Sequence, residues 1–493
     1  MKHPYTYLLF SCLLLFSCNC EKTVKITVTS DIIQTDFIGN GIEWDPYDEA
    51  IHWDADISDE DWEKLYKRLD FMHPRFVRCM INSHFKYFDS ITGKYEREKN
   101  IKNLKKLLQY CQDKDITVMY GEFNPPTWEM KSDQKWVDMS VDYLNYLVTE
   151  LGFTCIKYFV IFNEPDGNWA STNGDYELWK NMLLKFWEKM KTYSQLTEKV
   201  KLAGPDVVLS YKNSSSQFDS EGWVRQTAVD VDSIIYLYDV HAYPGQYEVR
   251  YGGKYLELLQ KHIAPVPTGK KIIMGEGGFK YWRTADSLLM KEYMKRLENH
   301  PFTKGSDCNM LVYDYFYGLD MAIFASVIMN LGYTGVAAWM LDDSMHSNGD
   351  SGKPEDIKLW GMWNILGSEV FNDSSQENIR PWYYAWSLMC RYFPDGCNIL
   401  NLSVENGEGI FSSAAEKDGK YTLVIININK EDKQIQIELP QNLSDVTIYE
   451  YSKEQIPESD EEFLPIKTGE KIGKSSCLNV KRETMLLITN YKL

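Results

Sequence analysis

The sequence predicts a (β/α)8 TIM barrel followed by a small antiparallel β-sandwich domain. Short apolar runs recur about every forty residues in the first three quarters of the chain, and amphipathic stretches separate most of them. From about residue 398 the helical pattern stops and only strand patterns remain. Strand–helix alternation is typical of a parallel sheet, and eight such strands favour a closed barrel over an open sheet.

The barrel is predicted over residues 36–390. Between its strands, apolar residues recur at helical spacing, as in Trp62–Phe71, Ile101–Cys111 and Val141–Val148. The gap before the eighth strand is longer than the others, so we expect an extended loop or an extra helix after the seventh strand. The eight predicted strands are Phe37–Ile42, Phe76–Ile81, Ile116–Tyr120, Ile156–Phe162, Val200–Ala203, Ile235–Val240, Lys271–Met274 and Val336–Leu341.

The β-sandwich is predicted over residues 391–493. Gln434–Leu439 alternates strictly between polar and apolar residues, as a half-buried strand does. Asp418-Gly419 lies between two apolar runs and indicates a hairpin turn. The early segment 22–34, which contains the apolar alternation Val24–Val28, precedes the barrel and could complete the sandwich.

The first residues are expected to be a targeting signal. Lys2 is followed by an apolar stretch, Leu8–Ser17, which is too short to span a bilayer. Leu15-Phe16-Ser17-Cys18 resembles a bacterial lipobox, so residues 1–17 are predicted to be removed and Cys18 to be lipidated. The alternative is an ordinary signal peptide that happens to contain cysteines. The lipobox places the mature protein in a bacterial cell envelope, with a lipid anchor as its only contact with the membrane.

The composition excludes several classes of function. A net charge of −18 argues against nucleic-acid binding, which needs a basic face. The ten cysteines are too few for a disulfide scaffold, and the eight histidines are scattered without metal-ligand spacing. We therefore expect no metal and no cofactor. Aromatic residues make up 14% of the chain, which hints at a surface that stacks on the flat apolar faces of a ligand.

Two glutamates follow predicted barrel strands. The fourth strand runs into Asn163-Glu164-Pro165, and the seventh runs into Gly275-Glu276-Gly277-Gly278. Active sites of such barrels lie at the carboxyl ends of the strands. Pro165 ends its strand and directs the chain away, while the glycines around Glu276 let a ligand approach closely. A single glutamate of this kind is usually a solvated rim residue, but the pair predicts a catalytic site.

These motifs resemble the clan A retaining glycoside hydrolases. Asn163-Glu164-Pro165 looks like the acid/base motif of that clan, and Glu276 stands where the clan carries its nucleophile. Leu202–Asp206 resembles families 39 and 51, and Arg380–Ala385 resembles families 30 and 39. The glycines that follow Glu276 look more like family 5, so the motifs do not fix the family.

The resemblance implies hydrolysis of β-glycosidic bonds in an oligo- or polysaccharide by double displacement. One carboxyl donates a proton to the leaving oxygen and the other attacks the anomeric carbon. The resemblance makes Glu276 the nucleophile and Glu164 the acid/base. It also implies substrate-site roles for several neighbours, with Arg78 beside the nucleophile, Asn163 at a sugar 2-hydroxyl and Trp339 under the bound sugar. The sixth strand adds His241 and Tyr243 to this set.

Other residues and another class of function remain open. Glu122, at the end of the third strand, is a candidate contact for a sugar hydroxyl, and Trp128 could line a subsite. Lys280–Leu319 and Asp342–Trp363 are expected to wall the cleft, where a closed end would indicate exo action and an open groove endo action. The alternative function is a non-catalytic glycan-binding lipoprotein on a degenerate barrel. A barrel isomerase or metal-dependent lyase fits poorly.

Overall fold

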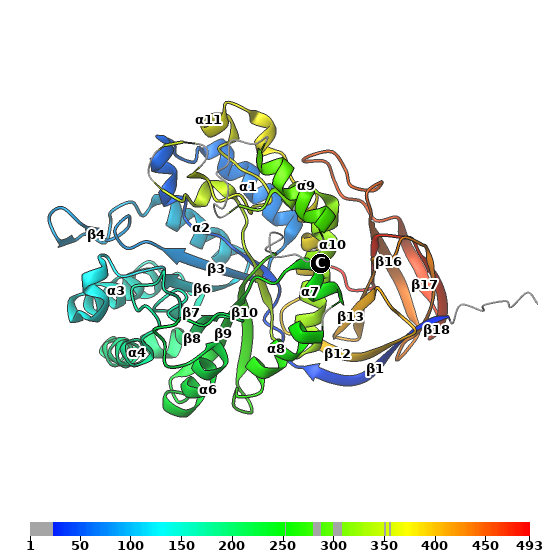
Figure 1. Cartoon of the computed structure of the whole chain (residues 1–493), viewed down its shortest axis with the longest axis horizontal. Coiled ribbons are helices and arrows are strands. Elements are labelled where there is room, and N and C mark those ends of the chain that lie inside the picture. Colours follow the sequence, from blue (N-terminus) through cyan, green and yellow to red (C-terminus); the bar gives the residue numbers. More distant parts are fainter. Residues whose placement is uncertain (1–22, 252, 280–286, 299–307, 350–351, 354–355) are drawn as a thin grey trace, which may run out of the picture.

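The protein consists of a closed barrel and a nine-stranded sheet that lies beside it (Figure 1). The computed structural model describes residues 23–251, 253–279, 287–298, 308–349, 352–353 and 356–493. The predicted signal and Cys18 lie outside these residues. In the described part of the chain, no helix is long and apolar enough to cross a membrane.

The barrel is built from eight parallel strands in the cyclic order β10-β11-β2-β3-β6-β7-β8-β9. The predicted barrel is therefore confirmed. The first strand begins four residues later than predicted, at Gly41, because residues 37–40 pair outside the barrel through loop hydrogen bonds. The strands are β2 (Gly41–Glu43), β3 (Phe76–Ile81), β6 (Thr117–Glu122), β7 (Ile156–Val160), β8 (Lys201–Val208), β9 (Ile235–Ala242), β10 (Lys271–Gly277) and β11 (Val336–Ala338).

Helices surround the barrel, and the described residues of the long gap after the seventh strand include α9 and α10. The three helical patterns read from the sequence fall on α1, on α2 and on α3 with the π-helical turn that follows it (Tyr146–Glu150). The helices are α1 (Asp59–Met72), α2 (Lys102–Asp113), α3 (Gln134–Asn145), α4 (Tyr176–Met190), α5 (Leu196–Lys199), α6 (Ser220–Asp230), α7 (Gln246–Tyr251), α8 (Gly253–Ile263), α9 (Ser287–Glu298), α10 (Tyr315–Asn330), α11 (Gly367–Phe371) and α12 (Trp382–Arg391).

The inside of the barrel is filled by alternate residues of its strands. Successive side chains of a strand point to opposite faces, so every second residue points inward. The inward residues form a core of their own, separate from the larger core between strands and helices. This core consists of Phe76, Met80, Met119, Val160, Ala203, Leu237, Ile273 and Ala337. Because the interior is filled, a ligand can meet the two glutamates at the carboxyl ends of the strands.

The second domain is one sheet in the order β17-β16-β19-β14-β13-β12-β1-β15-β18, which curls around its own apolar core. The sequence predicted an antiparallel domain, but β1 pairs parallel with β15. The reason is that β1 precedes the barrel in the sequence whereas β15 follows it. No hairpin therefore connects the two strands and sets their relative direction. Its strands are β1 (Val24–Gln34), β12 (Asn398–Glu405), β13 (Ile410–Lys417), β14 (Lys420–Asn427), β15 (Lys433–Glu438), β16 (Leu443–Tyr451), β17 (Lys467–Ile472), β18 (Ser475–Val480) and β19 (Thr484–Thr489).

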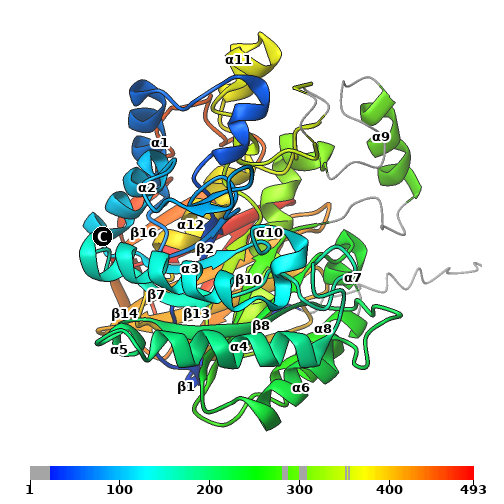
Figure 2. The same cartoon turned by 90° about the vertical axis from the view of Figure 1, so that its left-hand side faces the viewer.

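Helix α10 joins the barrel to this sheet, as Figures 1 and 2 show from two sides. It is apolar all round, which is typical of a helix buried on every side, and it packs against α12 and β13. The Tyr451 hydroxyl donates to the Tyr315 carbonyl at 2.6 Å, and the Asn330 amide donates to the Ser412 carbonyl at 2.8 Å. These contacts make the sheet a support for one side of the barrel.

Candidate active site

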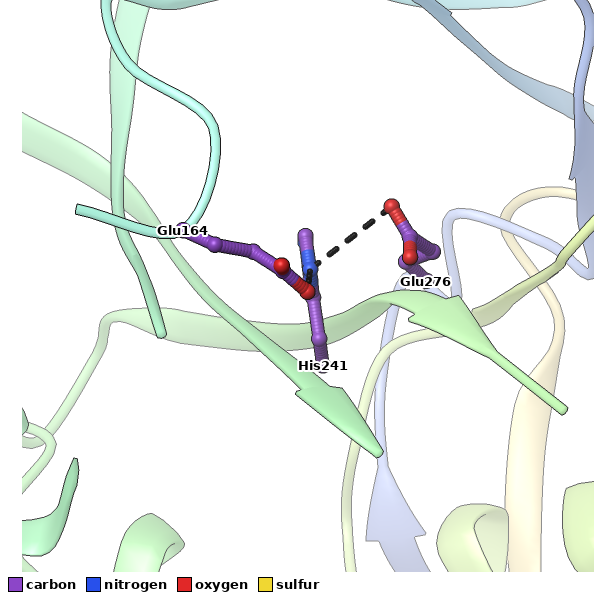
Figure 3. A group of neighbouring side chains, drawn as sticks. All are labelled: Glu164, His241 and Glu276. Atoms are coloured by element: carbon purple, nitrogen blue, oxygen red, sulfur yellow. Dashed lines mark hydrogen bonds and ion pairs between the residues drawn. The ribbon is translucent and has the colours of Figure 1, made fainter. Parts of the chain in front are cut away.

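The two glutamates face each other across the mouth of the barrel. Glu276 is the sixth residue of β10, and Glu164 lies four residues beyond the end of β7. One carboxylate oxygen of each lies within 4.8 Å of the other and of a His241 nitrogen. Figure 3 shows His241 between the two carboxylates. The chain thus brings together two acids that are more than one hundred residues apart in sequence.

Two hydrogen-bond donors and one histidine surround the carboxylate of Glu276, which is 5% exposed. Arg78 donates to Oε2 at 3.0 Å, the Tyr243 hydroxyl donates to Oε1, and His241 Nδ1 lies 3.7 Å from Oε2. Burial raises the pKa of Glu276 above its ordinary value, whereas His241, Arg78 and Tyr243 oppose this rise. The donors are arranged for a carboxylate anion with a defined orientation.

Hydrogen bonds fix both the backbone and the side chain of Glu164. His241 Nδ1 bonds Oε1 at 3.0 Å, and the Trp169 indole donates to Oε2 at 2.6 Å. The backbone adopts a φ of 46°, a left-handed conformation that is uncommon for a residue with a side chain. The Glu164 amide donates to Asp206 Oδ2 at 3.0 Å, which helps to hold this conformation. Such strain is found where the surroundings fix a side chain for function.

Arg78 connects several groups of the site. Its guanidinium is fully buried and donates to both oxygens of Glu43 at 2.9 Å, to Glu276, and to the Asn163 carbonyl oxygen at 2.7 Å. Because the carbonyl oxygen of Asn163 is engaged in this way, its amide nitrogen is the group left to donate toward a ligand in the cavity that Asn163 lines. Arg78 therefore orients Asn163 and Glu276 together.

His241 lies between carboxylates on both sides. Its Nδ1 bonds Glu164 at 3.0 Å, and its Nε2 bonds Asp206 at 3.1 Å. Burial disfavours the charged ring, but Asp206 and Glu276 raise the pKa of His241 well above its ordinary value. A protonated imidazole donates from both nitrogens and cannot ligate a metal. The three groups Glu164, His241 and Glu276 thus suit the handling of protons better than the binding of a metal ion.

The pair lies in a cavity of about 960 Å³. Trp339 lines it and is stacked on His346 at a centroid distance of 5.2 Å. The ammonium group of Lys358 lies 5.7 Å from the Trp339 ring centroid. Two segments expected to wall the cleft contribute, since Tyr293, His346 and Lys358 fall within them. The lining residues are Glu49, Asn82, Phe123, Asn124, Asn163, Glu164, Trp169, Val208, Leu209, Ser210, Tyr211, Tyr243, Glu276, Tyr293, Met294, Leu297, Trp339, His346 and Lys358.

Sequence reasoning missed several residues of this site. Glu43 and Asp206 lie at strand ends, like the two predicted glutamates, and that position was their available signal. Trp169 lies five residues after Glu164 and contacts it, but a tryptophan in a loop carries no distinctive pattern. His346 lies in the loop after β11, where it bonds Asp45 at 2.7 Å, and nothing in its local sequence indicates a role.

The expected contact between Glu122 and a sugar is wrong. Glu122 is 1% exposed and does not line the cavity. Its carboxylate accepts hydrogen bonds from the Tyr87 hydroxyl at 2.8 Å, the Trp136 indole at 3.0 Å and the Ser140 hydroxyl. Burial raises its pKa to about 6. The side chain points outward from the barrel toward α3, so it stabilises the packing of that helix.

Replacing Glu122 with alanine should therefore affect stability and not substrate binding. Three buried donors would lose their acceptor, which costs about 3 kcal/mol of the free energy of unfolding. Urea unfolding of Glu122→Ala measures this loss, and Glu122→Gln, which keeps an acceptor oxygen, should lose less. A raised KM with unchanged stability would instead show that Glu122 contributes to substrate binding.

Trp128 does not line the cavity either. It begins a short 3-10 helix (Trp128–Ser132), and its side chain is 52% exposed. The nearby loop residues Phe123 and Asn124 take part in the cavity wall instead. The chain turns away at Pro125 and Pro126, which carries the tryptophan past the rim. The expectation of a subsite at Trp128 is not met by this geometry.

Comparison with known proteins finds likeness in structure and not in sequence. No model of a protein family matches the chain, and no curated protein matches it. A GH39 β-xylosidase from Caulobacter crescentus is 12% identical, with a TM-score of 0.60 over 95% of this chain and 99% of that one. The catalytic domain of GH30 xylanase C from Talaromyces cellulolyticus is also 12% identical, with a TM-score of 0.61 over 95% of this chain and 100% of that one.

An endo-β-1,6-glucanase is 16% identical, with a TM-score of 0.61 over 95% of this chain and 94% of that one. All three likenesses extend over nearly the whole chain, so they include the β-domain as well as the barrel. Identities this low establish the fold alone. The protein therefore has the fold of the GH30 and GH39 glycoside hydrolases, a (β/α)8 barrel joined to a β-domain.

Proposed function

We propose that the protein is a retaining β-glycosidase with Glu276 as nucleophile and Glu164 as acid/base. The observation that carries the proposal is the distance between the two carboxylates, whose nearest ligand oxygens lie within 4.8 Å inside a cavity. Retaining enzymes separate their carboxyls by about 5–5.5 Å, whereas inverting enzymes need about 6.5–9.5 Å to admit a water molecule. The short separation favours retention.

In the first step, the Glu276 carboxylate attacks the anomeric carbon as Glu164 gives its proton to the glycosidic oxygen. The bond from carbon to the leaving oxygen breaks, and a glycosyl ester forms on Glu276. The donors Arg78 and Tyr243 hold the nucleophile in place for this attack. In the second step, Glu164 takes a proton from water, the water oxygen attacks the same carbon, and Glu276 leaves as a carboxylate.

Two further residues support the binding of a sugar between the acids. The Asn163 amide nitrogen is left to donate to a sugar 2-hydroxyl, an interaction that strengthens in the transition state. Trp339 lines the cavity, and its aromatic ring would serve as a stacking platform for a sugar. Both roles are proposals for this chain and rest on the lining of the cavity.

The hydrogen-bond partners of Glu276 and Glu164 favour a catalytic role over glycan binding alone. A protein that only binds sugar has no need of a nucleophile oriented by Arg78 and Tyr243 or of an acid held at a left-handed φ. A paired acid and nucleophile would also impose a cost through their mutual repulsion. The alternative of a glycan-binding lipoprotein therefore explains less of the site.

A panel of β-glycosides tests the proposed function. The solved structures compared above are described as acting on xylan, β-xylosides and β-1,6-glucan, so aryl β-xylosides, aryl β-glucosides and those polysaccharides are the first substrates. Wild type should hydrolyse at least one of them and Glu276→Ala should not. Binding without hydrolysis across the panel would favour the capture protein, and equal activity of both proteins would remove Glu276 from the mechanism.

The raised pKa of Glu276 predicts the acidic limb of the pH profile of activity. Protonation of this group removes the nucleophile, and burial raises its pKa above 4.5. We expect kcat/KM to fall as pH decreases through this raised pKa. Tyr243→Phe removes a donor that favours the ionised form, so the acidic limb should move to higher pH. Tyr247→Phe, an exposed residue of α7 outside the cavity, is the matched control and should leave the limb in place.

We also propose that the protein is exported and anchored by lipid at Cys18. The support is the lipobox-like Leu15-Phe16-Ser17-Cys18 after a short apolar stretch. Radiolabelled palmitate fed to expressing bacteria should label the wild type and not Cys18→Ala. Equal labelling of the two, or none of either, would contradict the anchor.

A further inference from the structure

Four neighbouring barrel strands each carry a carboxyl group near the mouth. Strand β7 leads to Glu164, β8 carries Asp206, β9 carries Asp239 and β10 carries Glu276. The two aspartates are buried, with exposures of 1% and 0%, and neither lines the cavity. They lie on the two strands between those that lead to Glu164 and carry Glu276.

Asp206 accepts hydrogen bonds from three groups of the site. Oδ2 accepts from the Glu164 backbone amide at 3.0 Å and from Arg78 at 3.2 Å, and Oδ1 accepts from His241 at 3.1 Å. Burial alone would raise its pKa, but His241 and Arg78 lower it below the ordinary value. Asp206 is therefore an anion that holds the backbone of the acid/base, its histidine and the arginine of the nucleophile.

Asp239 has a different environment. Its Oδ1 accepts from the amide of Gly275, the residue before the nucleophile, at 2.9 Å. Its Oδ2 is buried and meets no hydrogen-bond donor among the described residues. One of its oxygens lies within 4.8 Å of ligand atoms of both Asp206 and His241.

A buried carboxylate oxygen without a donor is costly unless it carries a proton itself. Burial raises the pKa of Asp239 well above its ordinary value, and the negative Asp206 raises it further. Two carboxyls at such a site titrate as a pair that shares one proton. The charged groups around the pair are the cations Arg78 and His241 and the carboxyls of Glu43, Glu164 and Glu276.

We propose that Asp206 and Asp239 share one proton and together form a buried brace that sets the distance between Glu164 and Glu276. The brace runs from the amide of Gly275 through Asp239 and Asp206 to the amide of Glu164. Both aspartates are positioning residues. Their effect on catalysis rests on the proposed glycosidase function, whereas the shared proton does not depend on it.

Asparagine has nearly the same shape as aspartate, but the proposal predicts opposite effects on kcat when it replaces Asp239 and when it replaces Asp206. Asparagine at 239 can accept from Gly275 and donate to Asp206, as a protonated carboxyl does, so Asp239→Asn should keep kcat within about threefold of wild type. Asparagine at 206 keeps one acceptor oxygen but turns an N–H group toward the donors of the other, so Asp206→Asn should lower kcat by about 100-fold with little change in KM. Asp239→Leu, which can neither accept nor donate, should resemble Asp206→Asn.

The controls separate positioning from general destabilisation. Asp142→Asn removes a carboxylate that accepts from Tyr95 and Tyr193 outside the site, and it should lower stability without changing kcat. Thermal unfolding of every variant shows whether it is folded at the assay temperature. An Asp239→Asn protein as impaired as Asp239→Leu, or an Asp206→Asn protein with wild-type kcat, would overturn the brace.

The proton itself is tested without any substrate. The infrared C=O stretch of a protonated carboxyl at neutral pH should be weaker in Asp239→Asn than in wild type and unchanged in Asp142→Asn. An unchanged band in Asp239→Asn would overturn the shared proton. If wild type hydrolyses no glycoside, the proposed function fails while the infrared comparison still decides this point.

Discussion

Glu276→Ala is expected to lower kcat for every β-glycoside by about 10⁴-fold or more, which corresponds to at least ~5 kcal/mol of lost transition-state stabilisation. Alanine cannot form the glycosyl ester, and it leaves a space beside the anomeric carbon. Azide is a small anion that can enter this space and attack the same face of the sugar. Azide should therefore restore turnover, with an α-glycosyl azide as the product identified by NMR.

The matched control for this variant is Glu49→Ala. Glu49 also lines the cavity, but it pairs with Ser347 and His346 and lies apart from the catalytic pair. Azide should give no rescue there. If azide restored the activity of Glu49→Ala and not that of Glu276→Ala, the nucleophile would be Glu49, in the loop between β2 and α1.

Glu164→Ala is expected to separate substrates by their leaving group. A natural sugar leaving group needs a proton, so its hydrolysis should slow by about 10³- to 10⁴-fold. Dinitrophenolate leaves without protonation, so the first step on a dinitrophenyl β-glycoside should remain fast and produce a burst, followed by slow release of the sugar. Azide should accelerate that release and give a β-glycosyl azide.

The anomer of the azide product distinguishes the two glutamates. Attack of azide on the intact β-glycoside in Glu276→Ala displaces the leaving group and inverts the centre, whereas attack on the glycosyl ester in Glu164→Ala gives net retention of the β configuration. Exchange of the two products would exchange the two roles. Equal loss of activity on dinitrophenyl and natural substrates by Glu164→Ala would show that Glu164 is not the proton donor.

Much of the barrel follows from local patterns. Most barrel strands are short, largely buried apolar runs, and such runs stand out from the amphipathic helices between them. The parallel pairing of β1 with β15 could not be read in the same way, because no turn connects these strands. Pairing between distant segments depends on how the whole chain packs.

The candidate site shows where sequence patterns stop being informative. Tyr120-Gly121-Glu122 and Met274-Gly275-Glu276 look alike, since each places Gly-Glu at the end of an apolar strand. The pairing of β6 with β3 is regular, and the shift between β6 and β7 places its extra residue on β7. Met119 therefore points inward and Glu122 points outward to the helices.

In β10 the pairing is irregular between Met274 and Glu276, where two steps on β10 match one on β9. A bulge of this kind turns the following side chain to the other face. Without it, Glu276 would share the outward side with Met274, because Ile273 points inward. Asp206 also lies at a bulge, because two steps on β8, from Pro205 to Val207, match one step on β9.

Bulges depend on packing against neighbouring strands, so a single sequence does not reveal them. This is why one glutamate after glycine forms part of the mouth and the other forms part of the core. It is also why Asp206 escaped notice, although it contacts three groups of the site.

The configuration of the first sugar released by wild type tests the central claim most directly. ¹H NMR of a reaction on an aryl β-glycoside, recorded before the sugar mutarotates, distinguishes the two anomers. Two carboxylates whose oxygens lie within 4.8 Å predict the β anomer first, with the α anomer appearing only later. Initial release of the α anomer would mean inversion and would contradict the assignment of Glu276 as nucleophile and Glu164 as acid/base.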